Sequence, residues 1–372
     1  MDDIQEYDLV KSTTGTEWHG KADPVEEIGE KEIAPLCFDI VQGAPSVAIT
    51  REVEDPETGI ITSVPTGEVI QVEGYKMLLA DLRHREDLTA KGINPRFYPI
   101  HAPKASYEVI SNRDVYEMAK RSFEALGCKL VTAGTLGNLR KFFLSIDIGN
   151  RDSKAVNGDL FQNYLNFITS HDGTFALEAY DSAIRIVCMN TFRWSRETAG
   201  EIGVKFYHTK NVAKQMENLP EYLEQIVNNR VKLMECMNEL ITILCSPTAM
   251  AHIAAGYLAN PLFDPEVKVD RLTSISFNRA CMIRDLSGKM GKGNQGKTLY
   301  DLFNGLTEFF THHDGAGGAK AGAMKRLSAS KFGAAADHKD QFLSLLLNPG
   351  KLAEVQEFGA KLFTDKEKDM AK

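Results

Sequence analysis

The spacing of hydrophobic and polar positions changes along the chain and divides it into three regions. Residues 36–210 carry short apolar runs, partly alternating and separated by turn residues, which is typical of antiparallel strands. After Lys210 the apolar residues recur at helical spacing, which predicts a mostly helical region over residues 211–372. Residues 1–35 are polar and mostly acidic, so we expect them to form an extended or weakly ordered arm.

The central region should combine one helix with several strands. Ser111 or Asn112 can cap a helix over Asp114–Leu126, and Gly127 is a suitable stop. The inner stripe of this helix is expected to be Val115, Met118, Ala119 and Ser122. A helix followed by an antiparallel meander predicts an α+β domain rather than a doubly wound parallel sheet. The strands are expected over Ser46–Val53, Ile60–Val64, Glu68–Val72, Cys128–Thr135, Leu139–Ile148, Leu160–Thr169 and Phe175–Met189. Alternation near the end of Leu139–Ile148 puts Leu144, Ile146 and Ile148 on one face.

The C-terminal region should open with a long helix from Pro220 to about Leu244, whose methionines and aliphatic residues form a core stripe. Residues 287–297 are rich in glycine and lysine and are expected to form a linker, and His312–Met324 should be a loop. Further helices are expected over Ala251–Leu258, Val267–Ser287, Thr298–Phe310, Lys339–Leu347 and Lys351–Leu362.

Composition adds limits to this picture. The net charge is −8, but residues 1–90 hold 7 Lys+Arg and 20 Asp+Glu, whereas the remainder holds 36 and 31. A mildly basic body is compatible with a polyanionic partner. No run of about 18 apolar residues predicts a membrane span, and the N-terminus lacks the apolar segment of a secretory signal. Six scattered cysteines without a CxxC pair indicate reduced thiols in a cytoplasmic protein.

The segment Ser170–Gly173, of sequence Ser-His-Asp-Gly, is the first candidate for chemistry. His171 and Asp172, with His208 nearby in the chain, could form an acid–base or metal centre, although a metal site needs at least three ligands. The alternative is a structural turn, because Asp-Gly suits a tight connection and Asp side chains bond to the local backbone. We therefore predict no metal and no established catalytic residue, with His171 and Asp172 as the weak candidates.

A second candidate matches the phosphate-loop pattern G-x-x-x-x-G-K-[ST] through Gly291, Gly296, Lys297 and Thr298. A working phosphate loop needs a buried strand before it and a helix after it. The helix is expected, but residues 284–290 are polar and broken by glycine, so a flexible basic linker is the alternative interpretation. The patterns G-x-S-x-G, H-E-x-x-H and G-x-G-x-x-G between strand and helix are absent, and no cofactor is predicted.

Basic residues alternate with aromatic residues in the central region, and proteins that bind single-stranded nucleic acid need both kinds of side chain. Cations neutralise phosphates, and aromatic rings stack on unpaired bases. The same aromatic residues could instead belong to the core. The candidate phosphate contacts are Arg140, Lys141, Arg185, Arg193, Arg196, Lys205 and Lys210.

Several motifs together resemble the phage/plasmid-like proteins, a family of unknown function carried by phages, plasmids and integrated elements. They are Trp18-His19-Gly20, Asn166 to Gly173 (N-x-x-x-S-H-D-G), Arg185 to Thr191 (R-I-V-C-x-N-T), His208-Thr209 and the late helix Thr298–Phe310. Lys21-Ala22-Asp23 departs from the family, where Gly or Leu-Gly usually follows Trp-His-Gly, and the basic loop Gly288–Lys297 is not a family feature.

The resemblance implies a mobile-element protein inside a bacterial cell, without an established activity. The expected α+β pattern is also reminiscent of single-strand annealing proteins, whose oligomers hold single-stranded DNA along a basic groove. A nucleic-acid-binding, annealing or recombination-accessory protein is therefore the first hypothesis, with single-stranded DNA as partner and a homo-oligomer as a possible state. A metal-dependent hydrolase acting through Ser170–Gly173 and a non-enzymatic protein that counters a host function are the alternatives. Whether the chain is an enzyme stays open, with a non-enzymatic role favoured.

Overall fold

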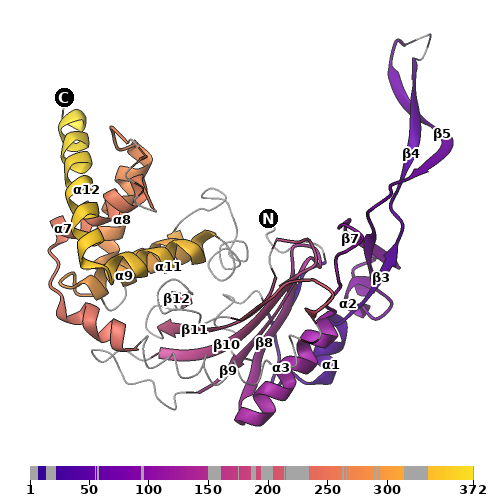
Figure 1. Ribbon diagram of the computed structural model, residues 1–372, viewed down its shortest axis with the longest axis horizontal. Coiled ribbons are helices and arrows are strands. Elements are labelled where there is room, and N and C mark those ends of the chain that lie inside the picture. The colour runs from indigo at the N-terminus through magenta and orange to yellow at the C-terminus, as the bar shows by residue number, and fades with distance from the viewer. Residues whose placement is uncertain are drawn as a thin grey trace.

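The structure is a computed structural model of the 372-residue chain. It describes residues 7–13, 22–54, 56, 58–93, 96–149, 161–174, 176–185, 190–193, 204–212, 214, 234–261, 264, 266–267, 269–288, 290–291, 294–313 and 334–371. A central sheet with a helix on one face lies between a projecting β-hairpin and a group of C-terminal helices (Figure 1). The predicted α+β class with a helical C-terminal part is confirmed.

The central sheet has eight strands in the order β12-β11-β10-β9-β8-β1-β2, with β13 also paired to β11. All neighbouring pairs except β1–β2 are antiparallel, so the predicted meander is confirmed. The strands are β1 (Leu9–Ser12), β2 (Asp23–Pro24), β8 (Lys129–Leu136), β9 (Lys141–Asp147), β10 (Phe161–Ser170), β11 (Leu177–Arg185), β12 (Asn190–Arg193) and β13 (Val204–Phe206).

Helix α3 (Asn112–Leu126) covers one face of this sheet and closes the main core of the central region. Its predicted inner stripe is confirmed at Val115, Met118 and Ala119, which are buried against the sheet. Ser111 caps the helix as expected, since its hydroxyl accepts from Asp114 N at 3.0 Å. The strand residues that pack against the helix alternate along the chain, as strand geometry requires: Phe142, Leu144, Ile146, Leu165 and Phe167.

The described part of residues 1–35 contradicts the expectation of an extended or weakly ordered arm. Strand β1 pairs with β8, and the short helices α1 (Glu30–Ile33) and η1 (Ala34–Leu36) follow. Ile33 and Leu36 are fully buried in the core beneath α3. The acidic composition of this segment hid its few apolar residues, which are the ones that the core uses.

A smaller sheet follows, with the order β3-β6-β7, and it leads into the hairpin β4–β5. The segments expected over Ile60–Val64 and Glu68–Val72 are one strand rather than two, because an irregularity near Gly67 interrupts the ladder without ending it. The elements are β3 (Asp39–Gly43), β4 (Ser46–Glu54), β5 (Ile61–Gln71), β6 (Met77–Asp81), α2 (Glu86–Ala90) and β7 (Phe97–His101).

The C-terminal region forms a separate helical core. Its first described helix covers residues 234–242, where Met234 and Met237 are buried as the predicted stripe requires. Residues 220–233 of the expected long helix lie outside the described residues. His312 and His313 belong to a π-helical segment, which corrects the loop expected from His312 onward. The remaining elements are α7 (Pro247–Ala259), α8 (Ser274–Ser287), α9 (Leu299–Glu308), η2 (Phe309–His313), α11 (Ala334–Leu346) and α12 (Pro349–Met370).

Helices α7 and α12 cross at backbone contact because each has a glycine at the crossing. A Cβ atom at Gly256 would overlap the carbonyl oxygen of Val355, and one at Gly359 would overlap that of His252. Glycine usually weakens a helix. Its presence at the crossing is explained by the close approach of α7 and α12, which leaves no room for a Cβ atom.

We expect Gly359→Ala to lower the free energy of unfolding by about 1–3 kcal/mol, because the added methyl group forces the two helices apart. Urea denaturation measures the change. Gly350→Ala, in the first turn of the same helix, is the matched control, since its Cβ would meet nothing closer than Asn348 Oδ1 at 3.7 Å. Equal effects of the two substitutions would contradict the proposed close packing.

Candidate functional site

The Ser170–Gly173 segment connects β10 to β11, and its histidine faces the protein interior. His171 is completely buried, and its backbone N–H donates to Arg140 O at 2.7 Å. Its ring atom Nε2 lies 2.7 Å from Asn112 Oδ1, while Asn112 Nδ2 donates to Leu36 O at 2.7 Å. These bonds join the end of β10 to the start of α3 and to η1.

The bonding partners fix the protonation of the His171 ring. Because the Leu36 carbonyl can only accept, Asn112 must present its amide group to Leu36 and its oxygen to His171. Nε2 of His171 therefore carries the proton, and Nδ1 is an acceptor that finds no hydrogen-bond partner among the described residues. Burial, reinforced by the nearby His208, lowers the pKa of His171 to about 3, so the ring is neutral at physiological pH.

Asp172 has a local structural role. Its Oδ1 accepts from Thr174 N at 3.1 Å and from Thr174 Oγ1 at 2.6 Å, which closes a turn around Gly173 at φ 75°. The described residues also contain no group of three or more His, Cys, Asp or Glu that could hold a metal ion. The geometry of His171 and Asp172 thus agrees with the turn interpretation and gives the metal interpretation no support.

Asn166, at the start of the same motif, forms its hydrogen bonds on the sheet face opposite α3. Asn166 Oδ1 accepts from Ser145 Oγ at 2.8 Å, and Asn166 Nδ2 donates to Ser182 Oγ at 2.7 Å. The three buried side chains form a polar row across β9, β10 and β11. A row that is satisfied internally rigidifies the sheet at the strand that leads to His171.

The segment that matches a phosphate loop uses its amide groups for another purpose. The carboxylate of Asp301 accepts from the backbone N–H groups of Gln295, Lys297 and Thr298 at 2.9–3.1 Å. The element before the segment is helix α8, not a strand. Among the four candidate residues, Gly296 has φ 70° and Gly291 packs against Leu286 O, so the glycines serve tight backbone geometry. A phosphate would compete with Asp301 for these donors and be repelled by it.

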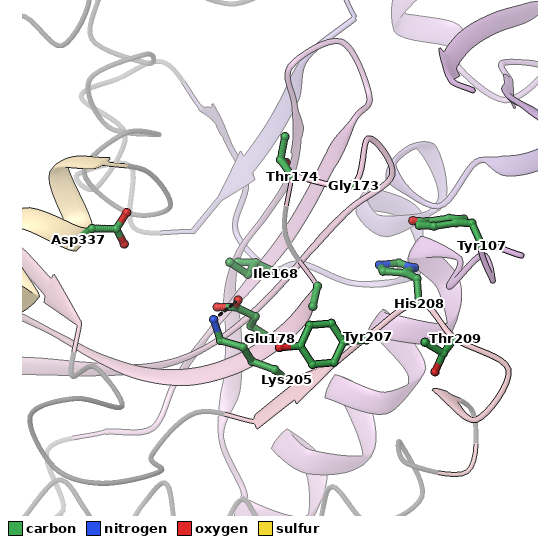
Figure 2. Close-up of a pocket in the computed structure, with 11 residues that line it drawn as sticks. Tyr107, Ile168, Gly173, Thr174, Glu178, Lys205, Tyr207, His208, Thr209 and Asp337 are labelled. Atoms are coloured by element: carbon green, nitrogen blue, oxygen red, sulfur yellow. Dashed lines mark ion pairs between the residues drawn. The ribbon is translucent and has the colours of Figure 1, made fainter. Parts of the chain in front are cut away.

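A hollow of about 640 Å³ lies where β10, β11 and β13 meet, beside the Ser170–Gly173 turn (Figure 2). The rings of Tyr107 and His208 stack at its wall, with centroids 4.6 Å apart and planes 12° from parallel. His208 Nδ1 lies 3.0 Å from Glu108 O, which makes Nδ1 the donor, so Nε2 accepts from Thr169 Oγ1 at 3.3 Å. Burial lowers the pKa of His208, although the bond to Glu108 acts in the opposite direction.

Charged and aromatic groups share this hollow. Lys205 Nζ forms an ion pair with Glu178 Oε1 at 2.8 Å, and Asp337 of α11 also lines the hollow. Tyr207 is 63% exposed, so its ring is open to solvent beside the hollow. Figure 2 shows Tyr207 beside the Lys205–Glu178 pair, with the Tyr107–His208 stack on the other side. The hollow thus offers an aromatic wall, two carboxylates and one partly neutralised cation.

The six predicted phosphate contacts that the structure describes do not gather in one place. Lys141 opens β9 and pairs in register with Ser170, and Arg140 is exposed just before it, so both lie at the sheet end that carries the hollow. Lys205 lines the hollow, and Lys210 is exposed nearby in the chain. Arg185 pairs with Phe161, at the other end of β10. The nine residue steps from Phe161 to Ser170 span about 30 Å. Arg193 ends β12, and Arg196 lies outside the described residues.

Sequence reasoning missed Tyr107, Asn112 as a partner of His171, Glu178 and Asp337. Tyr107 and His208 are about a hundred positions apart, and no local pattern connects them. In the sequence, only the run of basic and aromatic residues at 205–210 pointed to this part of the chain.

A family model described as a domain of unknown function (DUF932) matches residues 99–339, which is well over half of the chain. The chain belongs to this family. The prediction that the chain belongs to a family of unknown function is therefore confirmed. The DUF932 match runs from β7 into α11, and it includes the hollow. No curated protein and no solved structure matched the chain. None of the helices in the described ranges combines the length and apolar character needed to cross a bilayer.

The buried His171 makes stability depend on pH. The pKa of His171 is about 3 in the folded protein, against about 6.5 in an unfolded chain, so between these values the unfolded state binds the extra proton. The stabilising contribution is complete above pH 6.5 and falls as the pH drops toward 3. We expect the loss of unfolding free energy between pH 7.5 and 5 to be smaller by about 2 kcal/mol in His171→Gln than in the wild type.

Urea denaturation at the two pH values measures this difference. Glutamine keeps an N–H donor for Asn112 and removes the titration. His84→Gln, at an exposed position, is the control and should keep the wild-type dependence. An unchanged dependence in His171→Gln would show that His171 does not titrate as a buried neutral group.

Proposed function

We propose that the chain is a non-enzymatic, single-stranded nucleic-acid-binding protein that contacts its ligand around the hollow at the end of the central sheet. The observation that carries this proposal is the exposed ring of Tyr207, held between Lys205 and Lys210 in the chain. An exposed aromatic ring beside cations can stack on an unpaired base while the cations contact the flanking phosphates. Single-stranded DNA is the preferred partner, in an annealing or recombination-accessory role.

The charges of the hollow assign different parts of the ligand to different positions. Glu178 and Asp337 repel phosphate from the interior, whereas carboxylates accept hydrogen bonds from the amino groups of bases. The phosphates would instead follow the rim, where Arg140, Lys141 and Lys210 offer cations at the same end of the sheet. The aromatic wall supports the base, and this division explains why the hollow is not itself strongly basic.

The setting is part of the same proposal. The motifs that resemble phage/plasmid-like proteins support a mobile-element protein in the cytoplasm of a bacterial host. No specific observation favours the metal-dependent hydrolase, because His171 and Asp172 are engaged in structural bonds and the described residues hold no metal-ligand group. The alternative of a protein that counters a host function likewise has no specific support in the described residues.

Tyr207→Ala should weaken binding of a fluorescein-labelled oligo(dT) roughly tenfold, because stacking on one aromatic ring contributes about 1–3 kcal/mol per base. Fluorescence anisotropy at low salt gives the dissociation constant. Tyr75→Ala is the matched control, since Tyr75 is also an exposed tyrosine, at 46%, but lies in the smaller sheet region. Absence of binding by the wild type at low salt, or equal loss in both variants, would overturn the proposal.

A second measurement separates phosphate contacts from stacking. Lys210→Gln should weaken binding and lower the slope of log affinity against log salt by about 0.7, the value for one phosphate contact on a single strand. Tyr207→Ala should leave that slope unchanged, because a stacked ring releases no counterion. Anisotropy titrations at several salt concentrations measure both slopes. Identical slopes in wild type and Lys210→Gln would show that Lys210 does not contact the phosphates.

A further inference from the structure

The ion pair between Glu178 and Lys205 belongs to a row of side chains that crosses the hollow. Glu178 pairs in register with Lys205 of β13 on one side and with Ile168 of β10 on the other. Residues paired across a ladder project from the same face of a sheet. Leu165 and Phe167 pack toward α3, so alternation places Ile168 and the rest of the row on the opposite face. All three residues of the row line the hollow.

The exposed ring of Tyr207 lies on the same side of the sheet as this row. Tyr207 follows Lys205 by two positions, and Phe206 between them is buried in the core beneath α3. Alternation therefore turns Lys205 and Tyr207 to the side away from that core. Figure 2 shows the Tyr207 ring beside the Glu178–Lys205 pair. A base that stacks on Tyr207 thus brings its hydrogen-bonding edge to these two charged side chains.

The pair offers an acceptor next to a donor. Glu178 Oε1 forms the ion pair with Lys205 Nζ at 2.8 Å, and Glu178 Oε2 has no hydrogen-bond partner within the described part of the chain. An ammonium group carries three N–H donors, so one ion pair does not use all of those on Lys205. The side chains of Glu178 and Lys205 are 12% and 35% exposed, so both can be reached from the hollow.

The bases differ in how well they match an acceptor next to a donor. Cytosine and adenine place an amino group beside a ring nitrogen that accepts, and guanine places two N–H donors beside a carbonyl oxygen. In thymine and uracil the single N–H donor lies between two carbonyl oxygens. If Glu178 accepts from that N–H and Lys205 donates to one oxygen, the second oxygen lies against the carboxylate and is repelled. The pair therefore matches the three bases that carry an amino group.

We infer that the Glu178–Lys205 pair reads the base stacked on Tyr207 and selects bases with an amino group over thymine and uracil. This selection rests on the proposed function, because it concerns the same hollow and the same ligand. Burial strengthens it: Glu178 is only 9% exposed, so a base without a matching donor removes water from the carboxylate and does not replace the lost hydrogen bond. Lys205 then contacts the base, and the cations of the rim remain for the phosphates.

Fluorescein-labelled oligo(dC) and oligo(dU) of equal length test the selection. Cytosine and uracil are of nearly equal size and differ only in the group at position 4 and in the proton on N3. Fluorescence anisotropy with the full chain, at low salt and at a slightly alkaline pH that keeps cytosine unprotonated, gives the two dissociation constants. We expect oligo(dC) to bind about tenfold more tightly than oligo(dU), which is within the discrimination that one well-matched contact gives between bases.

Glu178→Gln is the decisive variant. Glutamine keeps the size of the side chain and adds N–H groups that can donate to a uracil oxygen, so the ratio of the two dissociation constants should fall to about one. A merely structural effect would weaken both oligonucleotides alike and leave the ratio unchanged, and urea denaturation checks that the variant folds. Glu124→Gln makes the same charge change at an exposed position of α3, on the other side of the sheet, and should keep the wild-type ratio.

Two results would overturn the selection and leave the proposed function standing. They are equal affinity of the wild type for oligo(dC) and oligo(dU), and a preference for oligo(dC) that persists in folded Glu178→Gln. A wild type that binds neither oligonucleotide at low salt would overturn the proposed function and the selection together. The comparison of Tyr207→Ala with the wild type on oligo(dT) measures stacking on a single kind of base, so its outcome does not depend on which base is preferred.

Discussion

The chain of hydrogen bonds from His171 through Asn112 to Leu36 is the constraint on which the central region depends. The His171 and Asn112 side chains are fully buried, and a buried polar group left without a partner destabilises the fold by about 1–3 kcal/mol. This chain of bonds joins three segments that are remote in sequence: the end of β10, the first turn of α3 and the end of η1. The Leu36 carbonyl can only accept a hydrogen bond. It therefore fixes the orientation of the Asn112 amide and, through Asn112, the protonation of the His171 ring.

The hollow depends on the same junction. The N–H of His171 bonds to Arg140 O, and Tyr107 Oη donates to Ser170 O at 3.1 Å. The basic residues at the start of β9 and the aromatic stack at 107 and 208 are thus both tied to the turn that His171 anchors. Asn166 strengthens the same strand from the opposite face through Ser145 and Ser182. A motif that resembles an active site is therefore the support of a neighbouring surface.

The sequence indicated the elements better than it indicated their contacts. Alternation at Leu144, Ile146 and Ile148 predicted a buried strand face, and helical spacing at Val115, Met118 and Ala119 predicted the face that packs on it, because both follow from backbone periodicity. The contacts of His171 could not be predicted, since Asn112 and Leu36 lie 59 and about 135 positions away. The phosphate-loop pattern matched by residue type, but Asp301, a few positions downstream, already bonds its amide groups. The acidic N-terminal segment showed how a low apolar content hides a strand that the sheet needs.

The place of β1 in the sheet has a consequence for synthesis. Leu9 pairs with Thr135, so β1 meets its partner strand only after more than a hundred further residues have been made. At bacterial and eukaryotic elongation rates this interval is roughly 6–25 s. During that time Leu9 and Val10, both buried in the finished fold, are exposed on a nascent chain with no strand beside them. The acidic residues around them keep that waiting segment solvated, and in the finished fold two of them form bonds: Asp8 Oδ1 accepts from Asn138 N at 2.8 Å, and Asp23 pairs with Lys11 at 2.7 Å.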